Sequence, residues 1–152
     1  LRAWARARST IARPFSTNRC WRAVGRAVSG VPTGSGVMIN SNDQVEIFKN
    51  RITNNNTANI VISSYFSANY AGQREIAAEF DPYPEQIMIY GNSFEGGGTA
   101  PGLDYLAQLR NALYGEQGQF PDILWDGLTI PSQRKSGNLP STPYSAVRSW
   151  AR

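Results

Sequence analysis

A nine-residue segment of this chain occurs twice, 42 positions apart. Residues 44–52 read QVEIFKNRI and residues 86–94 read QIMIYGNSF, so Gln, Ile and Asn recur at equal positions and the apolar differences are conservative. A weaker echo links residues 36–39 (GVMI) with residues 59–62 (NIVI). In a β-solenoid each coil stacks on the next, so inward apolar residues must recur once per coil. The repeat therefore predicts a solenoid.

The apolar runs around the repeat have the length of β-strands. They are Val37–Ile39, Val45–Phe48 and Asn59–Ile62, each bounded by Asn, Ser or Gly. Alternation along residues 45–48 places Val45 and Ile47 on one face and Glu46 on the other. An antiparallel sandwich with Asn-rich turns is the alternative that this pattern leaves open.

Asn50 and Asn92 occupy the same position in the two copies of the repeat. We interpret them as structural corners, because stacked Asn amides can hydrogen-bond the coils above and below. Asn also tolerates the left-handed backbone that a sharp corner requires.

The remaining segments predict loops, one helix and one further strand. Residues 67–85 interrupt the repeat and are expected to leave the coil at a corner as a loop, with helical turns over Glu75–Phe80 before the two prolines. Residues 95–102 (EGGGTAPG) predict a flexible turn. Leucines at helical spacing predict a helix over 103–114, ended by Gly115 or Gly118. Residues 121–130 predict another strand and a turn.

Charge divides the chain into three parts. Residues 1–42 carry seven Arg and no acid, residues 43–130 carry eleven acids against four bases, and residues 131–152 carry four bases and no acid. The overall pI near 9.5 suggests a nucleic-acid binder, but the acidic centre argues against one, so no nucleic acid is expected as a partner. The chain has no run of 18 apolar residues, so no transmembrane segment is predicted.

We accordingly divide the chain into an irregular basic segment (1–30), a solenoid domain (31–130) and a disordered basic tail (131–152). Three interpretations of 1–30 stay open. They are a transit peptide, a basic amphipathic helix with a helical part around Trp21–Val28, and an out-of-frame translation. The tail is open to the last interpretation too.

Residue types that the chain lacks exclude several chemistries. It has no His and one Cys, Cys20, so it cannot contain a His-based triad, a His-ligated metal, an internal disulfide framework or a multi-Cys zinc site.

Three segments together resemble bacterial right-handed parallel β-helix repeat proteins of the pectin-lyase-like superfamily. They are residues 36–66, 81–94 and 121–127, within a resemblance that covers roughly 31–127. The resemblance implies an all-β fold, a right-handed parallel β-helix of about three to four coils with one short α-helix. It also implies an extracellular or periplasmic setting and contact with carbohydrate. Members of this group are longer, so the chain is expected to be a fragment that self-associates through open solenoid ends.

Pectate-lyase-like members of the superfamily hold calcium with carboxylates and use Arg or Lys as base. Here the candidate carboxylates are Asp43, Glu79, Asp81 and Glu85, with Arg51 or Arg74 as base. Asp122 and Asp126 are the candidate acid pair for glycoside hydrolysis. No motif joins either set, so the catalytic residues stay unknown, no metal site is predicted, and calcium enters only under a lyase function.

Aromatic residues are the clearer indication of binding. Tyr65, Phe66, Tyr70, Phe80, Tyr83 and Tyr90 are expected to cluster around the inserted loop. With a nearby acid such rings can stack on sugars and hydrogen-bond them, so the predicted carbohydrate-binding residues are Tyr65, Tyr70, Asp81 and Tyr83. We therefore expect a non-catalytic β-helix module that binds polysaccharide, or alternatively a fragment of a polysaccharide lyase or glycoside hydrolase. Asn55–Thr57 matches a glycosylation sequon, which Asn-rich corners generate by chance.

Overall fold

The protein is described from a computed structural model, which covers residues 5–7, 31–67, 79–129 and 147–150. Within these residues the chain is mostly β-strand with one short helix, so the fold is all-β. The elements, in chain order, are β1 (Ala5–Ala7), β2 (Ser35–Asn40), β3 (Val45–Phe48), β4 (Arg51–Asn55), β5 (Ala58–Ser63), β6 (Ile87–Tyr90), β7 (Ser93–Gly97), α1 (Asp104–Tyr114), β8 (Ile123–Trp125) and β9 (Val147–Trp150).

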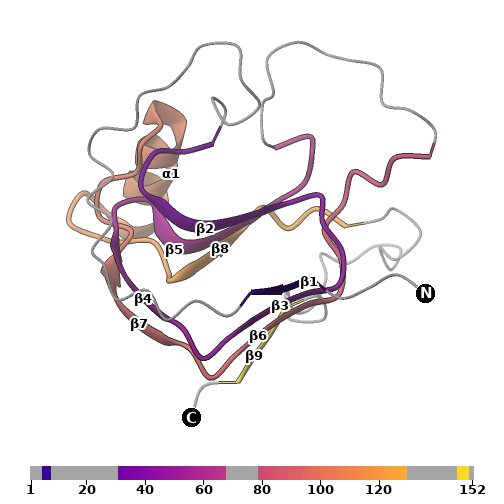
Figure 1. Cartoon of the computed structure of the whole chain (residues 1–152). Coiled ribbons are helices and arrows are strands. Elements are labelled where there is room, and N and C mark those ends of the chain that lie inside the picture. Colours follow the sequence, from indigo (N-terminus) through magenta and orange to yellow (C-terminus); the bar gives the residue numbers. More distant parts are fainter. Residues whose placement is uncertain (1–4, 8–30, 68–78, 130–146, 151–152) are drawn as a thin grey trace.

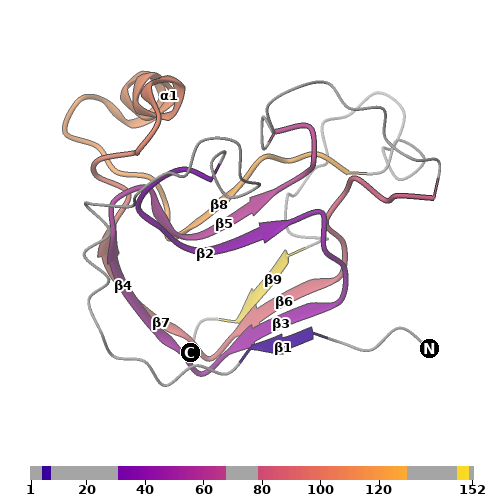
Figure 2. The same cartoon turned by 45° about the horizontal axis from the view of Figure 1, so that its top comes forward.

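The strands form three parallel sheets, which the chain visits in rotation. The sheet orders are β1-β3-β6-β9, β2-β5-β8 and β4-β7. β2, β3 and β4 belong to the second, first and third of these sheets, respectively. β5, β6 and β7 follow the same order, and β8 begins it again. We call one such passage through the three sheets a circuit. Figures 1 and 2 show the sheets as three walls around a common interior.

Strand register follows the sequence repeat. Glu46 pairs with Met88 and Arg51 with Ser93, each 42 positions later. The first copy of the nine-residue repeat, in β3 and β4, therefore pairs in register with the second copy, in β6 and β7. Val37 pairs with Ile60, 23 positions later, as the weaker echo predicted. The three predicted strands are confirmed, and parallel pairing throughout excludes the antiparallel sandwich for the described strands.

Isoleucine side chains fill the interior. The core cluster contains Ile39, Ile47, Ile52, Ile60, Ile62, Ile87 and Ile89. Register stacks these residues between circuits, for example Ile39 on Ile62 and Ile47 on Ile89. The predicted inward face of β3 is confirmed, because Ile47 is buried and Val45 packs against the cluster. Burying one such side chain stabilises a fold by about 1.5–3 kcal/mol.

The corners of successive circuits share the same left-handed backbone positions, but these are not the Asn positions that we expected. Left-handed φ values occur at Gln44 and Gln86 (56° and 54°) and at Lys49 and Gly91 (54° and 60°), each pair 42 positions apart. We expected the left-handed residue at Asn50 and Asn92, but it is the residue before each Asn. The Asn can then use its amide for hydrogen bonds while its neighbour turns the chain.

The two corner Asn side chains connect consecutive circuits. Asn92 Oδ1 accepts hydrogen bonds from Asn50 N at 2.9 Å and Asn50 Nδ2 at 3.1 Å, and Asn92 Nδ2 donates to the Ile47 carbonyl at 2.8 Å. Asn50 Nδ2 also donates to the Phe48 carbonyl at 3.0 Å. These two amides therefore satisfy the Asn50 N–H and the carbonyls of Ile47 and Phe48.

Two connections in the second circuit are long. Residues 64–86 join β5 to β6, whereas the equivalent connection in the first circuit, from β2 to β3, takes only residues 41–44. Residues 98–122 join β7 to β8, whereas the equivalent connection from β4 to β5 takes only residues 56–57. The second long connection carries α1, which begins one residue after the predicted start and ends at Gly115 (φ 78°) as expected. The two long connections leave the walls at different corners (Figure 1).

Some expectations were wrong or lie outside the described residues. Glu95–Gly97 belongs to β7, which pairs with β4, and is not a free turn, because Gly96 and Gly97 lie close to Asn54 and Asn55 of the neighbouring strand. The helix expected at Glu75–Phe80 falls largely in 68–78, and the one at Trp21–Val28 falls in 8–30, both outside the described residues. In the described part of the chain, no helix has the length and apolar character needed to cross a membrane.

Candidate functional site

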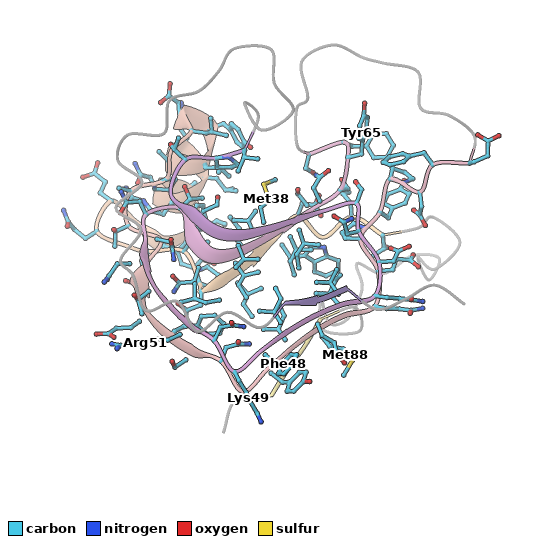
Figure 3. The ribbon with its side chains drawn as sticks, in the orientation of Figure 1. Met38, Phe48, Lys49, Arg51, Tyr65 and Met88 are labelled. Atoms are coloured by element: carbon cyan, nitrogen blue, oxygen red, sulfur yellow. The ribbon has the colours of Figure 1, made fainter. Side chains whose placement is uncertain are left out.

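The long connection after β5 and the short one after β2 meet at one corner of the molecule. Ser41 Oγ donates to the Pro82 carbonyl at 3.0 Å, and Tyr65 N donates to the same carbonyl at 2.9 Å. Gln44 N donates to the Glu85 carbonyl at 3.0 Å, continuing the strand-like ladder around the corner. The end of the connection that carries Pro82 and Glu85 is therefore held on the first circuit, and Tyr65 joins the other described end to it. Figure 3 labels Tyr65 at this corner.

Four aromatic rings gather here, and we call them the aromatic cluster: Tyr65, Phe66, Phe80 and Tyr83. Tyr65 meets Phe80 edge-to-face with ring centroids 5.5 Å apart and Phe66 at 6.3 Å. Phe66 and Tyr83 lie 5.7 Å apart. Phe66 and Phe80 are nevertheless 55% and 43% exposed. Packed rings with exposed faces present a rigid apolar surface to a ligand.

Beside the aromatic cluster lies a polar hollow of about 300 Å³, which we call the acidic hollow. It is lined by Ser41, Asn42, Asp43, Gln44, Glu79, Phe80 and Asp81. Phe80 belongs to both features, so the apolar surface and the hollow are continuous. The described lining contains three carboxylates and no Lys or Arg.

Carboxylates at this corner repel one another. The pKa of Glu85 is raised above its ordinary value, first by burial and then by the nearby charges of Asp81 and Asp43. Backbone donors hold the two neighbours in place, since Glu85 N donates to Asp43 Oδ1 at 3.1 Å and Tyr83 N donates to Asp81 Oδ1 at 3.0 Å. The corner thus concentrates negative charge on side chains that the backbone orients.

Gln44 lines the acidic hollow and carries an unsatisfied amide oxygen. Its Oε1 atom is buried and has no hydrogen-bond donor among the described residues. An unpaired buried oxygen costs about 1–3 kcal/mol.

The structure brings most of the residues predicted for sugar binding together. Tyr65, Asp81 and Tyr83 lie at this one corner, whereas Tyr70 falls in 68–78, outside the described residues. The prediction for Tyr90 was wrong, because it stacks on Phe48 at 5.3 Å with ring planes 4° apart. Register in the β3–β6 pair takes Tyr90 away from the inserted loop, and Figure 3 labels Phe48 at the opposite side from Tyr65.

Acids proposed for a calcium site also converge, but Arg51 does not join them. Asp43, Glu79 and Asp81 line the acidic hollow and Glu85 lies close to two of them. Arg51 instead forms an exposed ion pair with Glu95 across β4 and β7, at 2.7 Å, and Arg74 lies outside the described residues. Across the described residues, no group of three His, Cys, Asp or Glu side chains is arranged to hold a metal ion.

Asp122 and Asp126, the candidate hydrolase pair, lie at the two ends of β8 and make structural hydrogen bonds. Asp122 Oδ1 accepts from Asn59 Nδ2 at 2.6 Å. Asp126 accepts from Ser64 N at 2.7 Å and from Leu128 N at 3.0 Å. These contacts connect the third circuit to the second and give both carboxylates a structural role.

The glycosylation sequon is buried. Asn55 is 6% exposed and its Nδ2 donates to Asn59 Oδ1 at 2.8 Å, while Thr57 is fully buried. Asn55 therefore cannot be reached by a glycosyl transferase in the folded protein.

Sequence reasoning missed one further feature, an apolar hollow of about 470 Å³ between α1 and the outer side of β2-β5-β8. Met38, Val61 and Leu124 line it from neighbouring strands in register, and Leu106 and Leu109 line it from α1. Alternate apolar residues pointing outward along these strands were the signal that could have indicated it.

Comparison with known proteins finds no matching family model, no matching curated protein and no matching solved structure. The family resemblance of the motifs therefore stays a prediction.

Proposed function

We propose that this chain is part of a right-handed parallel β-helix in an exported protein, and that it binds polysaccharide without cleaving it. The rotation of strands through three parallel sheets, with residues 23 or 42 positions apart in register, supports this architecture. Rigid stacked circuits suit a scaffold whose inserted loops carry the binding surface.

The observation that carries the function is the continuity of the aromatic cluster with the acidic hollow at one corner. Exposed faces of Phe66 and Phe80 can stack on the C–H faces of sugar rings. Asp81 and Glu79 can accept hydrogen bonds from sugar hydroxyls. Both kinds of contact are needed because stacking supplies affinity while directional hydrogen bonds supply orientation.

The test is affinity electrophoresis of the full chain through gels that contain soluble polysaccharides of different chemistry. Retardation by at least one polysaccharide is expected, and Phe80→Ala should reduce it about tenfold, because aromatic stacking contributes on the order of 1 kcal/mol or more. Tyr114→Ala, at the exposed end of α1, is the matched aromatic control. The proposal fails if a folded chain migrates freely in every gel, or if the two substitutions have equal effects.

A polysaccharide lyase or glycoside hydrolase is the second candidate. It is favoured by the raised pKa of Glu85 near Asp81, because a carboxyl whose protonated form is favoured beside a second carboxylate suits the role of general acid. This function predicts new reducing ends or unsaturated products, lost in Glu85→Gln. If wild-type protein releases no product from any bound polysaccharide, with or without added calcium, the binding function stands and catalysis does not.

We also propose association of copies end to end. Among the described strands, β2 and β8 are the outer strands of their sheet, so each pairs on one side. Such edges can pair with another chain. Sedimentation velocity should show concentration-dependent species larger than the monomer, and a single monomeric boundary across a hundredfold concentration range would exclude association.

A further inference from the structure

We propose that copies of this chain stack head to tail, with β2 of one copy pairing in parallel on β8 of the next and Val37 lying in register with Ile123. This inference rests on the end-to-end association proposed above. It adds the polarity and the register of the contact. It also makes the assembly an open row of copies, because a head-to-tail contact along the solenoid axis does not close on itself.

Interior side chains are less buried at the two ends of the second sheet than in its middle strand. All six residues of β5 are buried, and Ile60 is 0% exposed. Ile39 is the one buried residue of β2, and β8 has none. Val37, Ile123 and Trp125 pack against the core cluster but are only partly buried. Since β5 is paired on both sides and β2 and β8 on one, each outer strand leaves apolar surface that a further strand would cover.

The two outer strands carry matching side chains at matching positions. Val37 and Ile123 both pair with Ile60, on the inward side. Met38 and Leu124 both pair with Val61, on the outward side. A β2 strand placed on β8 in this register would therefore meet the kind of neighbours that β5 has on each of its sides. Each square ångström of apolar surface removed from water stabilises such a contact by about 25 cal/mol.

The three-walled cross-section favours a head-to-tail contact over a two-fold one. β2 and β8 run parallel to β5 and lie on opposite sides of it (Figure 2), so stacking copies along the axis continues a parallel ladder. It also places each wall over a wall of the same kind. A two-fold axis would instead set β8 antiparallel to β8 of the partner copy and exchange two of the walls, so at most one wall would lie over its own kind.

The first sheet sets a condition on this contact. β9 extends that sheet by one strand beyond β6, and β1 extends it by one strand before β3. When β2 of one copy lies directly on β8 of the next, these two strands reach the same level, where one strand has room. One of them must give way, and they are only three and four residues long. Opening a short edge strand costs little free energy, but it keeps the association weak and concentration-dependent.

The experiment uses disulfide cross-linking between full chains. Cys20→Ser removes the one thiol of the sequence, and Met38→Cys and Leu124→Cys are made separately in that background. Paired positions in neighbouring strands have Cα atoms about 4.8 Å apart, within the range of roughly 4.4–6.8 Å that disulfides span. We expect mixed dimers in at least about tenfold excess over same-variant dimers, since association holds the thiols at an effective concentration on the order of millimolar. Tyr114→Cys on exposed α1, mixed with Leu124→Cys, is the control for random collision.

A chain that carries both Met38→Cys and Leu124→Cys tests open growth. Its two thiols cannot bond within one copy, because β2 and β8 flank β5 and lie about 10 Å apart, beyond the limit of about 7 Å. We expect a ladder of covalent dimers, trimers and larger species in a denaturing gel. A single dimer band would overturn open growth.

The other outcomes separate this contact from association in general. An excess of same-variant dimers overturns the head-to-tail polarity and leaves association intact. Cross-linking no greater than the control, in chains that still form larger species in sedimentation velocity, overturns the contact between β2 and β8. A single monomeric boundary for the folded wild-type chain removes both the contact and the association.

Lysine variants test the same contact without thiols if the cysteine variants fail to fold. Met38→Lys blocks the β2 edge and Leu124→Lys blocks the β8 edge, since lysine on an edge strand opposes further pairing. Each folded variant alone should sediment as a monomer, and an equimolar mixture should form a dimer and nothing larger. A variant that dimerises alone, or a mixture that stays monomeric while the wild type associates, overturns the proposal.

Discussion

Asn59 is the side chain whose replacement tests the stacking of circuits most directly. It is fully buried, and its amide makes three hydrogen bonds to three different segments. Oδ1 accepts from Asn55 Nδ2 at 2.8 Å, and Nδ2 donates to the Gly96 carbonyl at 2.9 Å and to Asp122 Oδ1 at 2.6 Å. One amide thereby joins the first, second and third circuits at a single corner.

The cost of Asn59→Ala follows from these bonds. Each contributes about 1 kcal/mol, and more where the acceptor is charged, as at Asp122. Asn55 Nδ2 keeps its bond to the Thr53 carbonyl at 3.2 Å, and exposed Asp122 can turn to water, so part of the loss is recovered. We expect the free energy of unfolding to fall by about 2–4 kcal/mol, which lowers the melting temperature by roughly 10 °C in a domain of this size.

The assay is urea unfolding of the full chain followed by circular dichroism and tryptophan fluorescence. Asn111→Ala on exposed α1 is the control and should leave stability nearly unchanged, because Ala is the better helix former. Asn59→Asp provides a second variant. It removes the donor and places two carboxylates together, so its destabilisation should diminish as the pH falls and the pair takes up a proton. A loss below about 0.5 kcal/mol in Asn59→Ala would refute the reasoning.

Three further predictions concern other positions. In thermal melts, Gly98→Ala should lower the free energy of unfolding by at least about 2 kcal/mol more than Gly127→Ala. Both glycines have left-handed φ (71° and 75°), but only at Gly98 would the new Cβ lie 2.5 Å from the Phe120 carbonyl oxygen. Equal losses of stability would contradict this reasoning. Glu85→Gln should raise stability at pH 7 by a few tenths of a kcal/mol and have little effect at pH 4. The sign follows from its raised pKa, since Glu85 stabilises the fold when protonated and that contribution is lost as pH rises through the folded pKa; a larger effect at pH 4 would contradict it. A double-mutant cycle of Phe48→Ala and Tyr90→Ala should give a coupling of about 0.5–1.5 kcal/mol for the stacked rings, and additivity would show that the stack is incidental.

Strand positions could be predicted because the repeat expresses a physical requirement of stacking. Residues that lie on each other in parallel register must be alike, so the 42-residue spacing in the sequence is the spacing of paired residues in β3–β6 and β4–β7. The same argument located the apolar interior, because period-two alternation identifies inward residues such as Ile47 and Ile89. The Asn corner was likewise visible as a repeated residue.

β7 and the left-handed corner residues could not be predicted so well. Three successive glycines are typical of a turn, yet Gly97 lies against Asn55 in a strand, because pairing with β4 outweighs the local preference. Lys49 adopts a left-handed φ although Asn50 beside it is the better candidate. The Asn50 side chain hydrogen-bonds to Asn92 of the next circuit, and this contact exists only once the two circuits are paired.

The candidate site shows the same division more sharply. From the sequence alone, the acids and aromatics between residues 41 and 85 could be identified as chemically suitable, and His-based catalysis could be excluded. Which of them meet was decided by tertiary structure: the coiling of the chain brings residues 41–44 beside 79–85, and it separates Tyr90 from Tyr65 and Arg51 from the acids. The physical reason is that stacking fixes which residues repeat along a wall of strands, whereas the direction of a corner loop depends on contacts between circuits that are distant in sequence.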